Sequence, residues 1–163
     1  MKINLQELYS LQALLDQEIA DIHHVDYKST HEKRLLALIV EIGELANETR
    51  CFKYWSNKGS SPKEIVMDEY ADGLHFLLSL GIPLHADKFE YEIKKENESL
   101  TLQIHHVYQA AIKLLDNYDL PHYEDAFQKY LNLAASIDMS VDDILNSYKN
   151  KLKVNHTRQH TNY

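Results

Sequence analysis

Hydrophobic and polar residues repeat with a helical period along most of this chain. From residue 5 to residue 21, leucine and isoleucine recur every three or four positions, which predicts an amphipathic helix. A capping-box pattern at Ser29–Glu32 predicts the start of a second helix, which we expect to end near Arg50. A similar pattern at Ser61–Glu64 predicts a third helix that ends near Leu80.

The second half of the chain continues this pattern. Residues 86–117 predict one long helix, or two helices broken near Asn97, and His122–Ile137 predict a further amphipathic helix. Ser140 opens a last capping pattern for a helix that we expect to end near Lys153. Because the connections are short, we expect an all-α fold, in which the helices form an antiparallel bundle.

Length and composition support a single helical domain. A chain of 163 residues can bury a hydrophobic core, and we expect one domain over residues 1–163. The end of the chain, about 154–163, has no hydrophobic period, so we expect a basic, mobile tail there. Only four glycines are present, and none forms the glycine-rich phosphate loop of nucleotide-binding α/β folds.

Charge and cysteine content limit the cellular compartments and the classes of partner that we expect for this protein. The formal net charge of −8 argues against direct nucleic acid binding, which needs a basic surface. The single cysteine, Cys51, excludes an internal disulfide and suits a reducing compartment. The first residues form no apolar signal core, and no apolar run approaches the roughly 20 residues that span a membrane. We therefore expect a cytoplasmic protein with no membrane partner.

Two acidic pairs are the most informative candidate ligands. Glu41 and Glu44 lie within the apolar run 35–46, and Glu69 and Asp72 precede a second apolar run. Each pair is spaced i, i+3, so both carboxylates share one helix face. Carboxylates in apolar surroundings repel one another and are costly to desolvate unless a cation lies between them. We predict one shared site for Mg²⁺, with Mn²⁺ possible, because all the ligands are oxygen atoms.

Gly43 and Gly73 each adjoin one of these carboxylates. Glycine inside a helix costs roughly 1 kcal/mol relative to alanine, so we expect a close packing contact at both positions.

Other metal chemistries fit the sequence less well. A lone pair of this spacing is more often a solvated helix face, but the apolar context favours a site. Di-iron bundles carry Glu-x-x-His motifs on two helices, whereas here Asp72-x-x-His75 has no histidine counterpart on the second helix. His156 and His160 are four residues apart, but with one cysteine and no His-Glu-x-x-His motif we do not expect zinc.

Two further segments offer groups for a base and for phosphates. Tyr54 and Trp55 lie between the two acidic helices, where they either stack on a planar base or pack as core aromatics. Lys58 follows in the same loop and is a candidate phosphate ligand. A basic segment at the end of the chain, free of acidic residues, either clamps a polyphosphate or is a solvated tail. Its charge of +4 comes from Lys149, Lys151, Lys153 and Arg158.

Taken together, these motifs resemble the all-α, MazG-like nucleoside triphosphate pyrophosphatases, and most closely their dimeric dUTPase branch. The resemblance covers almost the whole chain. The matching segments are Leu11–Leu15, Glu41-x-x-Glu44, Phe52–Asn57 with Trp55, Glu69-x-x-Asp72, Asp72–Ser79 and Tyr148–Tyr163. Leu152 and Asn162 depart from the family's common residues, and Asp16 stands where some relatives have Asn.

The resemblance implies a role for each matched residue. The four carboxylates would bind Mg²⁺, with Glu41 and Glu44 also catalytic and Glu44 the general base. The resemblance also implies a homodimer. Two groups of residues would bind a deoxyuridine nucleotide, one at its uracil end and the other at its phosphates. Those groups are Gln12, Asp16 and Trp55 for the uracil end, and Lys151, Asn155 and Arg158 for the phosphates, with Tyr163 near the end of the clamp. We expect His75 and Lys58 to bind the substrate as well, His75 because it lies in the matched run after Asp72 and Lys58 because it lies in the loop of Trp55.

The expected activity is the Mg²⁺-dependent hydrolysis of dUTP, and possibly of dUDP, which limits uracil incorporation into DNA. Two alternatives stay open: a house-cleaning pyrophosphatase for dCTP or a modified nucleotide, and a helical interaction module without activity. Pyrophosphate release from a panel of nucleotides separates the three.

Overall fold

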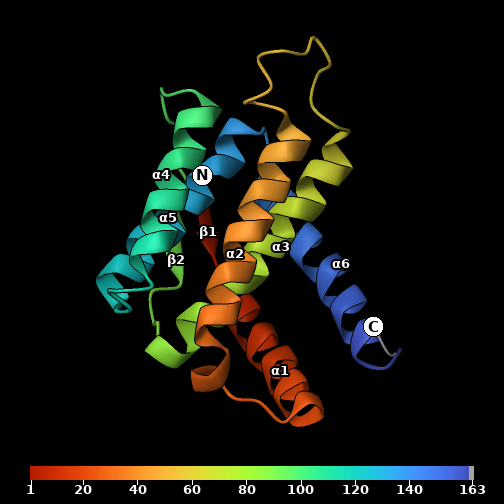
Figure 1. The fold of residues 1–163 in the computed structure, drawn as a ribbon, viewed down its shortest axis with the longest axis vertical. Coiled ribbons are helices and arrows are strands. Elements are labelled where there is room, and N and C mark those ends of the chain that lie inside the picture. The colour runs from red at the N-terminus through yellow and green to blue at the C-terminus, as the bar shows by residue number, and fades with distance from the viewer. Residues whose placement is uncertain (162–163) are drawn as a thin grey trace.

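The computed structural model describes residues 1–161 and is almost entirely helical, which confirms the expected all-α fold (Figure 1). The described residues form six α-helices, one short 3₁₀ helix, η1, and a small two-stranded sheet. In chain order the elements are β1 (Lys2–Asn4), α1 (Gln6–His23), α2 (Tyr27–Thr49), α3 (Lys63–Gly81), η1 (Ile82–Leu84), β2 (Glu90–Glu92), α4 (Leu100–Lys113), α5 (Leu120–Ser136) and α6 (Val141–Gln159).

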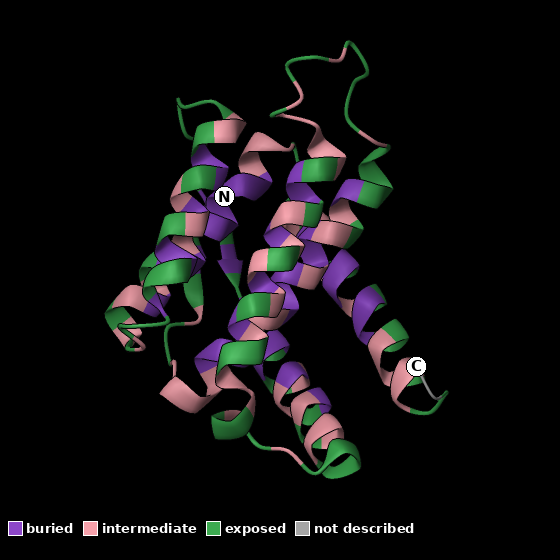
Figure 2. Cartoon of the chain, in the orientation of Figure 1, coloured by how far each residue is buried: buried purple, intermediate pink, exposed green. Residues whose placement is uncertain are grey.

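Helix α3 is the centre of the bundle. It packs against α1, α2, α5 and α6, and most of its residues from Tyr70 to Gly81 are buried (Figure 2). Helix α2 packs along α3 and α4, but its outer face stays open, with Leu36 and Val40 exposed. The most apolar stretch of the sequence is therefore the one that the other helices surround.

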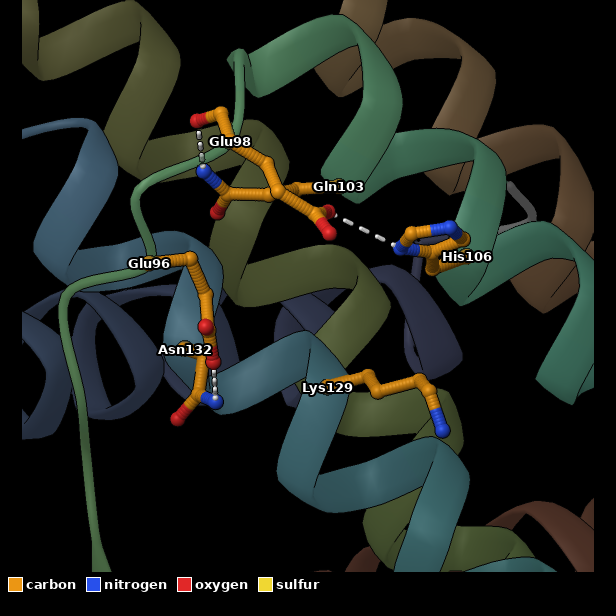
Figure 3. A pocket seen from close by; sticks show the side chains of 6 residues that line it. All are labelled: Glu96, Glu98, Gln103, His106, Lys129 and Asn132. Carbon is orange, nitrogen blue, oxygen red and sulfur yellow. Dashed lines mark hydrogen bonds and ion pairs between the residues drawn. The ribbon is translucent and has the colours of Figure 1, made fainter.

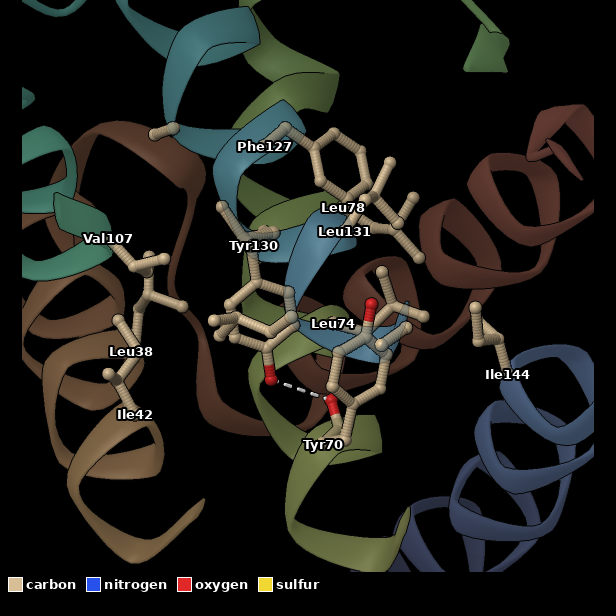
Figure 4. Close-up of a cluster of buried hydrophobic side chains, with 14 of the residues drawn as sticks. Leu38, Ile42, Tyr70, Leu74, Leu78, Val107, Phe127, Tyr130, Leu131 and Ile144 are labelled. Carbon is tan, nitrogen blue, oxygen red and sulfur yellow. Dashed lines mark hydrogen bonds between the residues drawn. The ribbon is translucent and has the colours of Figure 1, made fainter. Parts of the chain in front are cut away.

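Two tyrosines determine how closely α3 and α5 approach. Tyr70 and Tyr130 stack with their ring centroids 4.8 Å apart, and the Tyr130 hydroxyl donates to the Tyr70 carbonyl over 2.8 Å (Figure 4). A Cβ placed on Gly73 would lie 2.2 Å from the Tyr130 hydroxyl oxygen. At Gly43 the nearest atom is the Tyr108 hydroxyl oxygen, at 3.0 Å from such a Cβ. The glycines thus do permit close packing, but their neighbours are tyrosine side chains from α4 and α5.

Two predicted helix starts were wrong. Helix α2 begins earlier, with Asp26 as its N-cap, and Ser29 is the third helical residue of that capping box. Asp26 is preferred because its carboxylate accepts from the Ser29 backbone N–H at 2.7 Å. Helix α3 has no side-chain cap, because the Ser61 hydroxyl donates to a carboxylate oxygen of Glu48 instead.

The prediction for residues 86–117 was partly wrong: a break near Asn97 does precede a helix, but the residues before it form a strand and irregular segments instead of a first helix. Only Leu100–Lys113 is helical, and Ser99 caps that helix. Before it, β2 pairs antiparallel with β1, so that Ile3 lies opposite Tyr91 and both side chains are buried. Burial of these two alternating positions outweighs the helical tendency of the polar residues around them.

Helix α6 begins as predicted at the Ser140 capping box but continues to Gln159, beyond the expected end near Lys153. Its last turns lie beside α1, where His156 and His160 contact Glu18. Within residues 1–161, no helix is both long enough and apolar enough to cross a membrane.

Candidate metal and nucleotide site

Three carboxylates from two adjacent helices meet at one place. Glu41 of α2 and Glu69 and Asp72 of α3 each offer an oxygen, and these oxygens all lie within 4.8 Å of one another. All three side chains are partly buried. The i, i+3 spacing turns Glu69 and Asp72 to the α2 side of α3, as the sequence predicted.

Glu44, the fourth predicted ligand, lies one turn further along α2 and is exposed. It is near enough for its charge to raise the pKa values of Glu41 and Glu69. The structure therefore places three carboxylates at the centre of the cluster and Glu44 at its solvent edge.

The carboxylates of the cluster resist ionisation. Burial, followed by the charges of Asp72, Glu44 and Glu69, raises the pKa of Glu41 to about 7. Burial and the charges of Glu44 and Asp72 likewise raise the pKa of Glu69 to about 7. Burial raises the pKa of Asp72 as well. A cation among these oxygens would favour their ionised forms and reverse these shifts.

The structure already brings one cation to the cluster. Lys151 of α6 is buried, and its ammonium group lies 2.6 Å from Asp72 and 2.7 Å from Asp68. Burial alone lowers the pKa of Lys151, but the hydrogen bonds and charges of Asp68 and Asp72 outweigh it and raise the pKa. Lys151 is therefore positively charged and links α6 to α3 at the metal-ligand candidates.

The predicted nucleoside residues of α1 and α3 form a buried hydrogen-bonded network. His75 Nδ1 donates to Gln12 Oε1 over 2.7 Å, and the Tyr148 hydroxyl donates to the same oxygen over 2.9 Å. Gln12 Nε2 donates to Asp16 Oδ1 over 2.8 Å. Burial lowers the pKa of His75 to about 4, so this imidazole is neutral at physiological pH. These contacts hold the Gln12 amide in one orientation.

Asp16 is held by groups that the sequence analysis did not select. Its Oδ2 accepts from the Ser79 hydroxyl at 2.7 Å and from the Tyr27 hydroxyl at 3.0 Å. Arg34 donates to the Ser79 carbonyl over 2.7 Å and so supports this arrangement from α2. Ser79 and Tyr148 both lie in sequence runs that match the family pattern, and this match could have identified them as site residues. Arg34 carried no such signal, because it lies outside those runs and its contact with Ser79 depends on how α2 packs against α3.

The aromatic loop projects beyond the C-terminal end of α2 (Figure 1). Trp55 is 64% exposed, and its ring meets the Tyr54 ring edge-on at 5.1 Å between centroids. Lys58 is also exposed. Helix α2 continues from Glu41 to Thr49, about 12 Å, before this loop begins. Trp55 is therefore not a core residue, and two helical turns separate its loop from the carboxylate cluster.

Three of the predicted phosphate ligands, Lys151, Asn155 and Arg158, lie on α6. Asn155 and Arg158 are half-buried, and the charge of Arg158 acts on Asp72, whose pKa it lowers against the effect of burial. Tyr163, and the departing residue Asn162, lie outside the described residues.

A separate shallow pocket lies between α4, α5 and the segment that precedes α4 (Figure 3). Its polar groups are engaged with one another: Asn132 donates to Glu96 over 2.8 Å, Gln103 donates to the Glu98 carbonyl over 2.9 Å, and His106 lies 3.1 Å from the Glu98 carboxylate. This pocket holds the segment against the bundle and contains none of the predicted site residues.

Comparison with known proteins agrees with the geometry. A family model described as dUTPase matches residues 4–163, which is nearly the whole chain. No curated protein matches the sequence.

Proposed function

The chain belongs to the dUTPase family, and we propose that it hydrolyses dUTP to dUMP and pyrophosphate with Mg²⁺ held between α2 and α3. Family membership makes it a dUTP diphosphatase that binds a nucleotide and depends on a divalent cation. The observation that carries the choice of site is the meeting of Glu41, Glu69 and Asp72.

The donor set supports Mg²⁺. The three central ligands are carboxylates, and Glu44 adds a fourth at the edge, so the ion meets hard oxygen donors and no thiolate or imidazole. Mn²⁺ fits the same oxygen donors. When bound, such an ion neutralises phosphate charge and lowers the pKa of a coordinated water.

The exposed carboxylate of Glu44 is the proposed general base. It lies at the solvent edge of the cluster, where a water molecule can reach it, and it accepts the proton of the attacking water. Glu41 orients the same water from the inner side. Because Glu41 is buried among other acids, its role depends on the cation that offsets their charge.

Lys151, Asn155 and Arg158 are the proposed phosphate ligands. With nucleotide and cation bound, the Lys151 ammonium would contact phosphate oxygens in place of Asp68 and Asp72. Charge supports this exchange, because Asp72 would then have the divalent cation as its partner. Arg158 and Tyr163 then close over the polyphosphate, and Lys58 approaches it from the aromatic loop.

The uracil end is assigned to Gln12, Asp16 and His75. The loop of Trp55 lies at the opposite end of α2 from Arg34 and Asp16, so stacking of Trp55 on this base requires the second subunit of the proposed homodimer. The buried network supports this assignment, because the Gln12 oxygen accepts two hydrogen bonds and one N–H donates to Asp16, which leaves a single N–H donor for a ligand. Carbonyl groups of uracil accept from such donors, whereas the amino group of cytosine does not. We also propose activity on dUDP, a cytoplasmic homodimer, and no direct binding of nucleic acid.

Hydrolysis of dUTP, dUDP, dCTP, dTTP and UTP with Mg²⁺, Mn²⁺ or EDTA tests these assignments. We expect release of dUMP and pyrophosphate from dUTP with Mg²⁺ and none with EDTA. Glu41→Gln should abolish turnover while the helical circular dichroism is kept, and Glu32→Gln on the exposed start of α2 is the matched control. A preference for dCTP would contradict the uracil assignment, and full activity of Glu41→Gln would contradict the metal site.

A further inference from the structure

A second group of metal-binding side chains lies between α1 and the end of α6, away from the carboxylate cluster. His156 Nδ1 contacts Glu18 Oε2, and His160 Nε2 lies 2.7 Å from Glu18 Oε1. One carboxylate thus holds two imidazoles from one helix face. Beside them, His23 Nε2 lies 3.0 Å from the side-chain oxygen of Gln159.

We propose that Glu18, His156 and His160 form a site for a divalent transition-metal ion, with Zn²⁺ as its natural occupant. The sequence did not lead us to expect zinc, because it could not show that Glu18 lies beside these histidines. Two histidines spaced i, i+4 on a helix present their rings on one face, as they do in His-Glu-x-x-His zinc sites. Glu18 adds the carboxylate, which completes a His₂Glu ligand set with an open fourth position.

The geometry needs only side-chain rotation to form this site. Each imidazole now contacts a different oxygen of Glu18, and the Cβ atoms of residues four apart on a helix are about 5–6 Å apart. In the present side-chain positions the ligand atoms of Glu18, His156 and His160 do not all lie within 4.8 Å of one another, so metal binding requires both rings to rotate about χ2, which is a soft torsion, toward one point beside the carboxylate.

The chemistry of the two sites keeps their ions apart. The cluster around Glu41 offers only oxygen, which suits Mg²⁺, whereas imidazole nitrogen favours Zn²⁺ and its neighbours in the first transition row. A metal ion at Glu18 would join the first helix to the last turns of the last helix, which carries Asn155 and Arg158.

Zinc titration in excess Mg²⁺ tests the proposal on protein made without a polyhistidine tag. Isothermal calorimetry should show a single equivalent of Zn²⁺ bound to the wild-type chain. Glu18→Gln and His160→Gln should each weaken that binding at least about tenfold. His105→Gln, on the exposed face of α4, is the matched control and should leave it unchanged.

Co²⁺ gives a second readout that does not depend on activity. The wild-type protein should show the visible absorption of Co²⁺ in a four-coordinate site, and the double variant His156→Gln/His160→Gln should not. Circular dichroism checks that each variant remains helical. Zn²⁺ binding that persists in the double variant, that disappears only in Glu41→Gln, or that is absent from the wild-type protein would each overturn the proposal.

Discussion

Replacing Gly73 with alanine should destabilise the fold, because the new methyl group has no space. Its carbon would lie 2.2 Å from the hydroxyl oxygen of Tyr130, 2.7 Å from Cζ and 3.0 Å from Cε2. The ring cannot move outward, since Tyr130 is fully buried and stacks on Tyr70. Either the ring or helix α3 must shift.

The size of the effect follows from three contributions. Inserting a methyl group into a filled core costs about 1–3 kcal/mol. Moving the ring breaks the 2.8 Å hydrogen bond from Tyr130 to the Tyr70 carbonyl, which costs about 1 kcal/mol. Alanine returns about 1 kcal/mol because it favours the helix more than glycine does. The free energy of unfolding should therefore fall by about 2 kcal/mol.

Urea denaturation followed by circular dichroism measures this change. Two matched variants separate the steric effect from the change in helix propensity. Gly43→Ala gains the same helix propensity of about 1 kcal/mol, and its methyl carbon lies 3.0 Å from only the hydroxyl of the half-buried Tyr108, so the free energy of unfolding should stay unchanged or rise by up to about 1 kcal/mol. In Gly73→Ala/Tyr130→Leu the two changes should cost less together than the sum of the single variants. A Gly73→Ala protein as stable as the wild type would refute the packing of Tyr130 against α3.

Three more predictions follow from the site and the core. Burial and neighbouring acids raise the pKa values of Glu41 and Glu69 from 4.5 to about 7, so ionising them opposes folding, and the metal-free protein should lose stability as the pH rises from 4.5 to about 7. In urea denaturation with EDTA at pH 8, Glu41→Gln should be more stable than the wild type by about 1 kcal/mol after allowance for partial exposure. An equal denaturation midpoint for the two proteins would contradict this. Lys151→Met removes a positive charge from beside Asp72. Mg²⁺ should therefore raise the melting temperature of this variant at a several-fold lower concentration than it does for the wild type, while kcat/KM for dUTP falls. The same Mg²⁺ dependence in both proteins would contradict the idea that Lys151 occupies the place of the cation beside Asp72. The Tyr70 hydroxyl is buried without a partner in the described part of the chain, so Tyr70→Phe should leave the urea midpoint unchanged or raise it, and a loss above about 1 kcal/mol would show a missed contact.

The helices could be predicted because their information is local. Periodicity located five of the six helices, and the Ser140 capping box fixed the start of α6. The pairing of Lys2–Asn4 with Glu90–Glu92 left no signal, because three residues are too few for a period and the partners are far apart in sequence. The same lack of local information explains why residues 86–99 were taken for a helix.

The candidate site was predictable to a similar extent. The spacing of Glu69 and Asp72 was enough to place them on one face, and apolar surroundings suggested that Glu41 joins them. Spacing could not show that Lys151 is buried against Asp72, because that contact depends on how α6 crosses α3. Nor could it show that a carboxylate lies beside His156, since Glu18 is 138 residues earlier in the chain.

The packing of α1 on α6 can form only late in biosynthesis, because the two helices lie at opposite ends of the chain. Residues that meet across this contact are 138 positions apart, as for Glu18 and His156. At about 5–20 residues per second, the first helix leaves the ribosome roughly 7–28 s before its partner is made. During that interval the apolar side chains of Leu8 and Leu15, which are buried in the finished bundle, have no last helix to cover them. The N-terminal helix therefore lacks its last packing partner until synthesis of the chain is nearly complete.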